Sequence, residues 1–334
     1  MNTVYTNIKN GDAMKTTFKI TTILINAILL LLRIALLLKK NEVLETLSKL
    51  DTFKNGLQHN KSQTSLQKYA VLACCWCFLI PVTIIIITTA EILANTDKYP
   101  TVHLPVGQNS TWDQKLHFFI YIAGHSTIYM MHFLAFPGLM IILLSFIYLS
   151  FVKTFQKHLE AVRIRLLKRF SKEEISKALS IFTVVKKIHL DIEKSVQLFS
   201  FLAYVLIFSN ILQMISGIVT SFMSDKGMIQ VMYTYVTLGM TIVWFIVLTL
   251  CGTQVGNTEL FVKNLSQDVI TKNFGEEVDG FKKLVYMNLF NACANFELKF
   301  TGCGMFVVDK KLFLTVTGIM VTYGVLFATE VSKM

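Results

Sequence analysis

Residues able to hold a small molecule recur along one long apolar stretch, 116–152. They are Tyr121, His125, Tyr129 and His132, separated by four, four and three positions. Because a helix turns once in about 3.6 residues, this spacing places the four side chains on one face. Polar groups that face lipid are costly, so we expect the stripe to face a bundle interior or a water-filled cavity. Two interpretations stay open: the stripe lines a ligand pocket, or it only bonds neighbouring helices.

Two further apolar stretches, 196–223 and 228–251, carry polar stripes of the same kind. The first holds Asn210, Gln213 and Gly217, and the second holds Tyr233, Thr237 and Trp244. Their spacings of three, four and seven place each set on one helix face. If the three stripes converge, the cavity has aromatic walls and a few donors and acceptors, as is typical of small-molecule sites. Such a pocket suits a sugar and equally suits a bitter aromatic compound.

Catalytic, cofactor and metal patterns are missing from the sequence. There is no GxGxxG, GxxxxGK[ST], HExxH or GxSxG pattern. Three of the six cysteines, Cys74, Cys75 and Cys77, lie inside an apolar run with no His or second Cys pair nearby. We interpret them as packing residues. We therefore expect no enzymatic activity, no cofactor and no metal site.

The elements that carry these stripes are long apolar segments, and they predict an all-α, polytopic transmembrane bundle. The chain has 334 residues, of which 53% are hydrophobic and only 16% charged, whereas soluble domains carry about a quarter charged residues. A helix needs about 20 apolar residues to cross a bilayer. Six segments qualify: 19–38, 69–90, 116–152, 196–223, 228–251 and 312–329. The first could be a secretory signal, but it is too long and Lys39 and Lys40 follow it instead of a cleavage site.

Loop charge predicts the orientation in the membrane. Loops 39–67, 153–195 and 253–301 hold 5, 11 and 5 Lys or Arg, a total of 21, whereas loops 91–115 and 225–227 hold 3. Basic loops stay in the cytoplasm, so we expect a multi-pass plasma-membrane protein with an extracellular C-terminus. This asymmetry also explains the net charge of +11 without a nucleic-acid partner. A glycosylation sequon at Asn109 falls on a predicted outside loop.

The cytoplasmic loops themselves carry helical patterns. Apolar residues in 153–195 recur at helical spacing, and Ser171 with Glu174 forms a capping-box pattern that starts a second helix. Residues 281–300 also predict an amphipathic helix. We therefore divide the chain into 1–252, a ligand-binding bundle with cytoplasmic helix extensions, and 253–334, an anchor helix followed by the last transmembrane helix.

The carboxyl-terminal stretch holds the most specific pattern. It combines a small-residue turn, a Phe, a hydrophobic-Asp pair and a Thr-Tyr pair ahead of apolar residues. These positions are Gly302, Gly304, Phe306, Asp309, Leu312, Thr322 and Tyr323. The pattern resembles the last transmembrane segment of the insect and arthropod gustatory receptors. Where that family has Gln-Phe, this sequence has Thr329 and Glu330, a departure at the expected pore mouth. The family has seven spans, so aligning from the C-terminus implies that the first is missing here.

This resemblance implies a ligand-gated, non-selective cation channel that detects a small-molecule tastant. It further implies a homo- or heterotetramer with receptors of the same family, in which the last helix lines a central pore. The ligand pocket would lie in the outer half of each subunit.

The expected pore and gate positions are Thr322, Leu326, Phe327, Thr329 and Glu330. Four copies of Glu330 would form a carboxylate ring that favours monovalent and also divalent cations; alternatively, Glu330 is a terminal residue in solvent. Leu326 and Phe327 suit a hydrophobic constriction, and Asp309 suits the N-cap of the last helix.

Other functions fit the sequence less well. An odorant receptor of the sister class has the same architecture, but the Gly302–Asp309 segment and Thr322-Tyr323 favour the gustatory class. A G-protein-coupled receptor needs a cytoplasmic tail. A transporter is expected to show two similar halves with broken helices at matching places.

Overall fold

Long helices dominate the computed structural model, which describes residues 2–55, 64–94, 112–168, 171–223, 228–273, 288–289, 291–293 and 295–332. The helices are α1 (Asn2–Asn55), α2 (Thr64–Ala94), α3 (Trp112–Met130), α4 (Phe136–Lys168), α5 (Lys172–Met223), α6 (Met228–Asn273) and α8 (Lys310–Ser332). Within the described residues, five helices (α1, α2, α3 joined to α4, α5 and α6) are long and apolar enough to cross a membrane. The all-α prediction is confirmed, and the chain is a membrane protein. The last predicted span forms α8, whose crossing stays a prediction.

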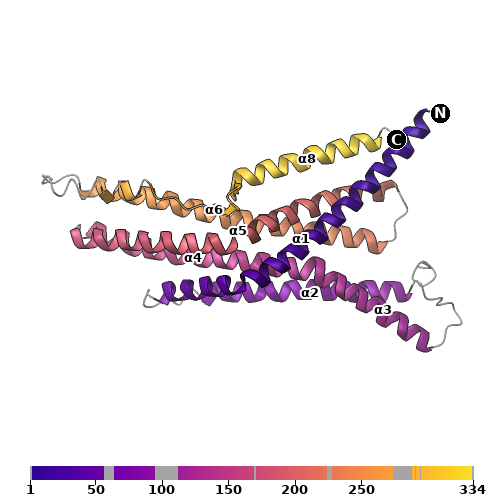
Figure 1. Cartoon of the computed structure of the whole chain (residues 1–334), viewed down its shortest axis with the longest axis horizontal. Coiled ribbons are helices and arrows are strands. Elements are labelled where there is room, and N and C mark those ends of the chain that lie inside the picture. The colour runs from indigo at the N-terminus through magenta and orange to yellow at the C-terminus, as the bar shows by residue number, and fades with distance from the viewer. Residues whose placement is uncertain are drawn as a thin grey trace.

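The helices are much longer than a bilayer requires. α5 has 52 residues, which gives about 78 Å at 1.5 Å per residue, against a hydrocarbon core of about 30 Å. α1 packs along α5, and α4 packs against both α5 and α6, so the long helices form one bundle (Figure 1). The predicted domain boundary at 252 falls inside α6, which is a continuous helix there. That division stays a prediction.

The predicted helix at 116–152 contains a local irregularity. A π-helical turn, η3 (Met131–Ala135), joins α3 to α4, and the Phe136 backbone N–H bonds the Met131 carbonyl. Pro137 follows at once. Proline lacks an N–H and clashes with the carbonyl four residues earlier, and a π turn absorbs that conflict without ending the helix. His132 therefore sits on a widened turn.

The break between α4 and α5 has the predicted cap. The Glu174 backbone N–H lies 3.4 Å from Ser171 Oγ, and the Ile175 N–H bonds the Ser171 carbonyl at 3.1 Å. The Glu174 carboxylate also lies 3.8 Å from Arg165 on α4. The cap and the charge pair start α5 immediately after α4 ends.

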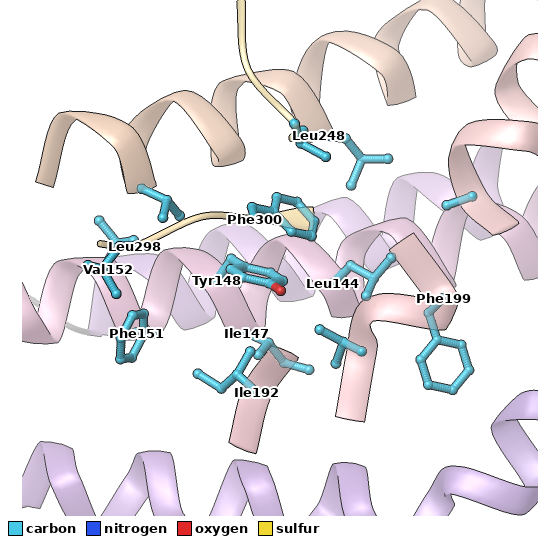
Figure 2. Close-up of a cluster of buried hydrophobic side chains, with 14 of the residues drawn as sticks. Leu144, Ile147, Tyr148, Phe151, Val152, Ile192, Phe199, Leu248, Leu298 and Phe300 are labelled. Carbon is cyan, nitrogen blue, oxygen red and sulfur yellow. The ribbon is translucent and has the colours of Figure 1, made fainter. Parts of the chain in front are cut away.

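A dense aromatic core lies between α4, α5 and α6, and Figure 2 shows it in close-up. Tyr148, Phe151 and Phe155 of α4 are all 0% exposed, and Phe199 of α5 is 1% exposed. Phe300, from the chain between α6 and α8, inserts among them with its ring centroid 3.8 Å from that of Tyr148. A segment that is neither helix nor long strand therefore completes the core.

The predicted amphipathic helix at 281–300 is wrong in its last part. Residues 281–287 lie outside the described residues, and helix is present at 288–289 and 291–293. From Phe296 to Phe300 the chain is extended, and buried residues alternate with exposed ones. A period of two marks a strand-like segment with one buried face. Packing of every second side chain into the core overrides the weaker helical periodicity.

Candidate functional site

A polar cluster joins three helices near the end of the bundle at which α1 begins and α5 ends. His132 Nε2 lies 3.3 Å from Asn26 Oδ1, and Gln213 Nε2 donates a hydrogen bond to Thr22 Oγ1 at 2.7 Å. Thr22 and Asn26 are one turn apart on α1, and Asn26 Nδ2 donates to the Thr22 carbonyl at 2.8 Å. We call Thr22, Asn26, His132 and Gln213 the polar cluster. It offers amide, hydroxyl and imidazole groups within two helical turns.

The α1 side of this cluster was not predicted from the sequence. Asn26 and Arg33 interrupt an otherwise apolar segment, and with Thr22 they are spaced by four and seven positions. That spacing is the signal that could have shown a polar face. Arg33 completes the face with its guanidinium carbon 5.0 Å from the centroid of the Phe136 ring.

The structure divides the predicted stripe of α3. Tyr121 is 54% exposed and Tyr129 38% exposed, and His125 is also exposed. These three residues are therefore not buried between the helices of the single chain, and the expectation that they face a water-filled cavity stays a prediction. The π turn shifts the register between them and His132, which is half-buried and reaches α1. Their contact with a ligand stays a prediction.

The stripes of α5 and α6 turn inward where they are described. Asn210 and Thr237 are each 5% exposed and Trp244 is 4% exposed. An added Cβ at Gly138 of α4 would lie 3.4 Å from the Trp244 ring, so this indole packs against α4. The side chain of Tyr233 lies outside the described residues.

Two buried hydroxyls remain without a hydrogen-bond partner in the layer of α5 and α6. They belong to Ser216, 1% exposed, and Thr237. An unpaired buried hydroxyl costs about 1–3 kcal/mol. Among the described residues, these groups are therefore suited to accept or donate to a small polar guest.

A second site lies in the chain that connects the bundle to α8. We call residues 296–309 the strap. It contains two short antiparallel strands, β1 (Thr301–Gly302) and β2 (Phe306–Val307), paired as Thr301 with Val307 and Gly302 with Phe306. At the turn, Cys303 and Gly304 have φ values of 51° and 69°. Glycine adopts this left-handed backbone readily, which explains Gly304.

The strap is held by polar side chains of α5 and α6. His189 Nε2 lies 3.0 Å from the Lys299 carbonyl, and the Thr301 hydroxyl bonds the Glu193 carboxylate. On the other side, Glu259 of α6 accepts a hydrogen bond from the Leu298 backbone N–H at 3.2 Å. These contacts satisfy backbone groups that the short strands leave unpaired.

Two glycines lie where another group comes too close for a side chain. An added Cβ at Gly252 of α6 would lie 2.0 Å from the Val308 carbonyl oxygen, so only glycine lets the strap pass there. An added Cβ at Gly302 would lie 2.4 Å from the Phe306 ring. That ring covers Gly302 and packs on Tyr204 of α5, with centroids 5.4 Å apart. The strap is therefore fitted closely to the bundle.

α8 begins at the end of the strap and leaves the bundle (Figure 1). Asp309 Oδ1 accepts a hydrogen bond from the Leu312 N–H at 2.9 Å, which confirms the predicted N-cap. Phe313 stacks on Phe245 of α6, with ring centroids 4.9 Å apart. Beyond this base the large side chains of α8 are mostly exposed. Leu314, Val321, Tyr323, Val325 and Leu326 are 68%, 60%, 46%, 56% and 55% exposed.

The predicted pore positions are only partly described. Thr322 and Thr329 are exposed, and their hydroxyls bond carbonyls of α8 itself, at Gly318 and Leu326. The side chains of Phe327 and Glu330 lie outside the described residues. Their roles stay predictions, as does glycosylation of Asn109, which also lies outside them.

The cysteines behave as packing or surface groups. Every cysteine is free, and burial raises the pKa of the Cys293 thiol to about 12. A thiol with that pKa stays protonated at neutral pH and is a poor nucleophile. Within the described ranges, no group of three or more His, Cys, Asp or Glu could hold a metal ion.

No protein-family model and no curated protein matches the chain. Its fold does resemble solved structures. The insect olfactory receptor OR5 from Machilis hrabei superposes with a TM-score of 0.59 at 14% identity, covering 94% of this chain and 80% of that one. The same receptor in complex with eugenol gives a TM-score of 0.56 at 14% identity, covering 92% and 82%. The chain therefore shares the fold of these receptor structures.

Proposed function

We propose that this chain is a subunit of a ligand-gated, non-selective cation channel that detects a small-molecule tastant. The observation that carries the proposal is α8: a capped apolar helix that packs on the bundle along its first half, with Val321, Val325 and Leu326 exposed in its second half. A single helix with so much uncovered surface suits contact with further copies of the chain. A central pore lined by α8 from four copies satisfies that need.

The polar cluster and the buried hydroxyls support a ligand site in the same chain. Polar groups within an apolar bundle are tolerated where they face each other or a water-filled cavity. A solved structure of similar fold is an olfactory receptor in complex with eugenol, a small aromatic molecule. The proposed ligand for this chain contacts the polar cluster and the inward faces of α5 and α6.

The strap supports a coupling between this site and α8. α5 carries Gln213 of the polar cluster and also His189 and Glu193, which hold the strap. A displacement of α5 on ligand binding would therefore reach the base of α8 through a rigid segment. In the orientation that loop charge predicts, the polar cluster lies in the outer half and the strap at the cytoplasmic face.

An odorant receptor is the second candidate, because the similar solved structures belong to an olfactory receptor. The two candidates differ in the ligand and share the channel. A panel of sugars and water-soluble bitter compounds, set against a panel of volatile odorants, separates them in one assay.

The test is expression in cells that lack such receptors. We expect purified protein in mild detergent to have the mass of a tetramer, and we expect ligand-dependent cation currents. A monomer or dimer with no current would contradict an autonomous channel. Replacing Glu330 with Gln should reduce divalent-cation permeability. Glu173→Gln, which removes an exposed carboxylate from the first turn of α5, is the matched control and should leave ion preference unchanged.

A further inference from the structure

A cleft of about 440 Å³ lies beside the strap, away from the polar cluster. One wall is α6 between Gly252 and Lys263, and the other is formed by residues 298–300 and 307–311. Its volume exceeds that of a single ion and falls within the range of about 300–1,000 Å³ for small-molecule pockets. The cleft was not predicted from the sequence, because its two walls are distant in the chain.

The cleft exists because α6 carries two glycines, and hence no side chain, at Gly252 and Gly256. Gly252 lies directly under the strap, whereas an added Cβ at Gly256, one turn further, would meet no atom within 4 Å. Gly256 and Asn257 are both exposed and line the cleft. Gly256 therefore forms a floor with open space above it, and the neighbouring Asn257 amide can donate hydrogen bonds into that space.

The charge of the lining is positive. Four lysines face two carboxylates there: Lys263, Lys299, Lys310 and Lys311 against Glu259 and Asp309. Both carboxylates already have partners. Glu259 accepts from Lys263 Nζ at 2.7 Å and from the Leu298 N–H, and Asp309 caps α8.

The two lysines at the start of α8, Lys310 and Lys311, form no ion pair in the described part of the chain. Lys299 Nζ bonds Glu297 at 2.9 Å, but Lys310 and Lys311 are exposed and pair with no carboxylate in the described part of the chain. Two adjacent ammonium groups beside an open cleft attract a polyanion more strongly than a single negative charge.

Apolar residues continue each wall on the membrane side. Leu314 is 68% exposed and lies one turn above Lys310 and Lys311, on the same face of α8. Leu250 is 56% exposed and lies on the face of α6 that carries Thr253 and Asn257. In the orientation of the proposed function, the cleft opens at the level where hydrocarbon meets the cytoplasmic headgroups. An amphipathic molecule with an anionic head fits this arrangement.

We propose that the cleft binds the phosphorylated headgroup of an anionic lipid of the inner leaflet, in the class of the phosphoinositides. Basic pockets at the cytoplasmic ends of transmembrane helices are suited to such headgroups. The ammonium groups of Lys310 and Lys311 bind the phosphates, Asn257 bonds a headgroup oxygen, and the acyl chains lie along Leu250 and Leu314. The lipid thereby joins α6 to the base of α8. This inference rests on the proposed orientation, but its test does not need a functioning channel.

The test measures binding to the purified full-length protein in detergent. The probe is a fluorescent short-chain phosphatidylinositol 4,5-bisphosphate. Lys310→Gln with Lys311→Gln removes the two ammonium groups, and we expect about a 10- to 30-fold loss of affinity. Gly256→Leu adds a side chain on the floor of the cleft, where a Cβ meets no atom within 4 Å, and we expect a similar loss of affinity. Lys186→Gln with Lys187→Gln removes an equally exposed adjacent pair from α5 and should change affinity less than twofold.

Three results would overturn the proposal. An affinity equal to wild type in both cleft variants places the lipid elsewhere. Equal affinity for soluble inositol trisphosphate and for the lipid shows that the acyl chains contribute nothing and that the ligand is a free phosphate. Binding to monomeric fractions but not to tetrameric ones shows that a second copy covers the cleft. Thermal unfolding of each variant confirms that it folds. Lipid binding without ligand-evoked current would contradict the channel and leave this site standing.

Discussion

The two ends of the bundle are built differently. Around the strap, Tyr148, Phe151 and Phe155 are 0% exposed, and the side chains of His189, Glu193 and Glu259 bond the strap itself. Around the polar cluster, by contrast, Tyr121 and Tyr129 are 54% and 38% exposed. Tight packing transmits displacement with little loss, whereas exposed aromatic side chains leave surface for a guest. One end is therefore suited to hold α8 and the other to accept a ligand.

The largest expected effect is at the centre of the packed end. Phe300→Ala removes a ring that is 1% exposed and packed against Tyr148, and it should lower the free energy of unfolding by about 3–5 kcal/mol. Tyr121→Ala, at the exposed end, should change it by less than about 0.5 kcal/mol. Thermal unfolding in detergent measures both. Equal effects would contradict the contrast between the two ends.

A pair of glycines on α6 sharpens the comparison. Gly252→Val places a Cβ 2.0 Å from the Val308 carbonyl oxygen. The strap must therefore shift, which should lower the free energy of unfolding by about 1–3 kcal/mol. Gly256→Val, on the same helix, meets open space and should gain slightly in stability from helix propensity. Unfolding midpoints that move together would show that the strap is not tightly fitted.

The open end should separate binding from stability. Gln213→Leu removes the hydrogen bond to Thr22, which contributes about 0.5–1.5 kcal/mol to folding, and it should raise the ligand concentration for half-maximal current about tenfold. Thr127→Val is the control, because this exposed hydroxyl donates to the Ala123 carbonyl of its own helix. A loss of stability as large as that of Phe300→Ala, with unchanged sensitivity, would reverse the assignment of the two ends.

The smallest effect concerns the turn of the strap. Cys303 has φ of 51°, a conformation that costs a non-glycine residue roughly 1–2 kcal/mol. Cys303→Gly should therefore stabilise the protein by about 0.5–1 kcal/mol after the entropy of glycine is counted. Cys303→Ser keeps the Cβ and should give no gain. Calorimetry on the two variants distinguishes strain at this turn from loss of the thiol.

Several sequence predictions concerned local features, and these were confirmed. Ser171 caps α5 and Asp309 caps α8 because a cap involves atoms only three residues apart. The structure explains four motif positions in the strap. Gly302 lies under the Phe306 ring and Gly304 has a positive φ, while Phe306 packs on Tyr204 and Asp309 caps α8. Thr322 and Tyr323 remain exposed on a single chain, so their roles as motif positions stay predictions that involve other copies.

The predictions that the structure modified depended on the direction of side chains and on partners distant in the chain. The α3 stripe shares one face in an ideal helix, but the π turn before Pro137 separates His132 from Tyr121 and His125. The segment 296–300 has apolar residues that fit either a helix or a strand at so short a length. Packing into the space between α4, α5 and α6 decided that this segment is not helical.

Hydrophobic pattern and loop composition alone determined that this is an all-helical membrane protein with long helical extensions, because those properties are sums over many residues. Only the tertiary structure decided that α1 joins the polar cluster and that residues 296–300 are not helical. It also decided that Gly252 lets the strap cross α6 and that Gly256 lines a cleft. Each of these depends on which helices lie side by side. That arrangement follows from packing between residues a hundred or more positions apart, such as Gln213 with Thr22 and His132 with Asn26. Local spacing can show which face of a helix is polar, but not which helix that face meets.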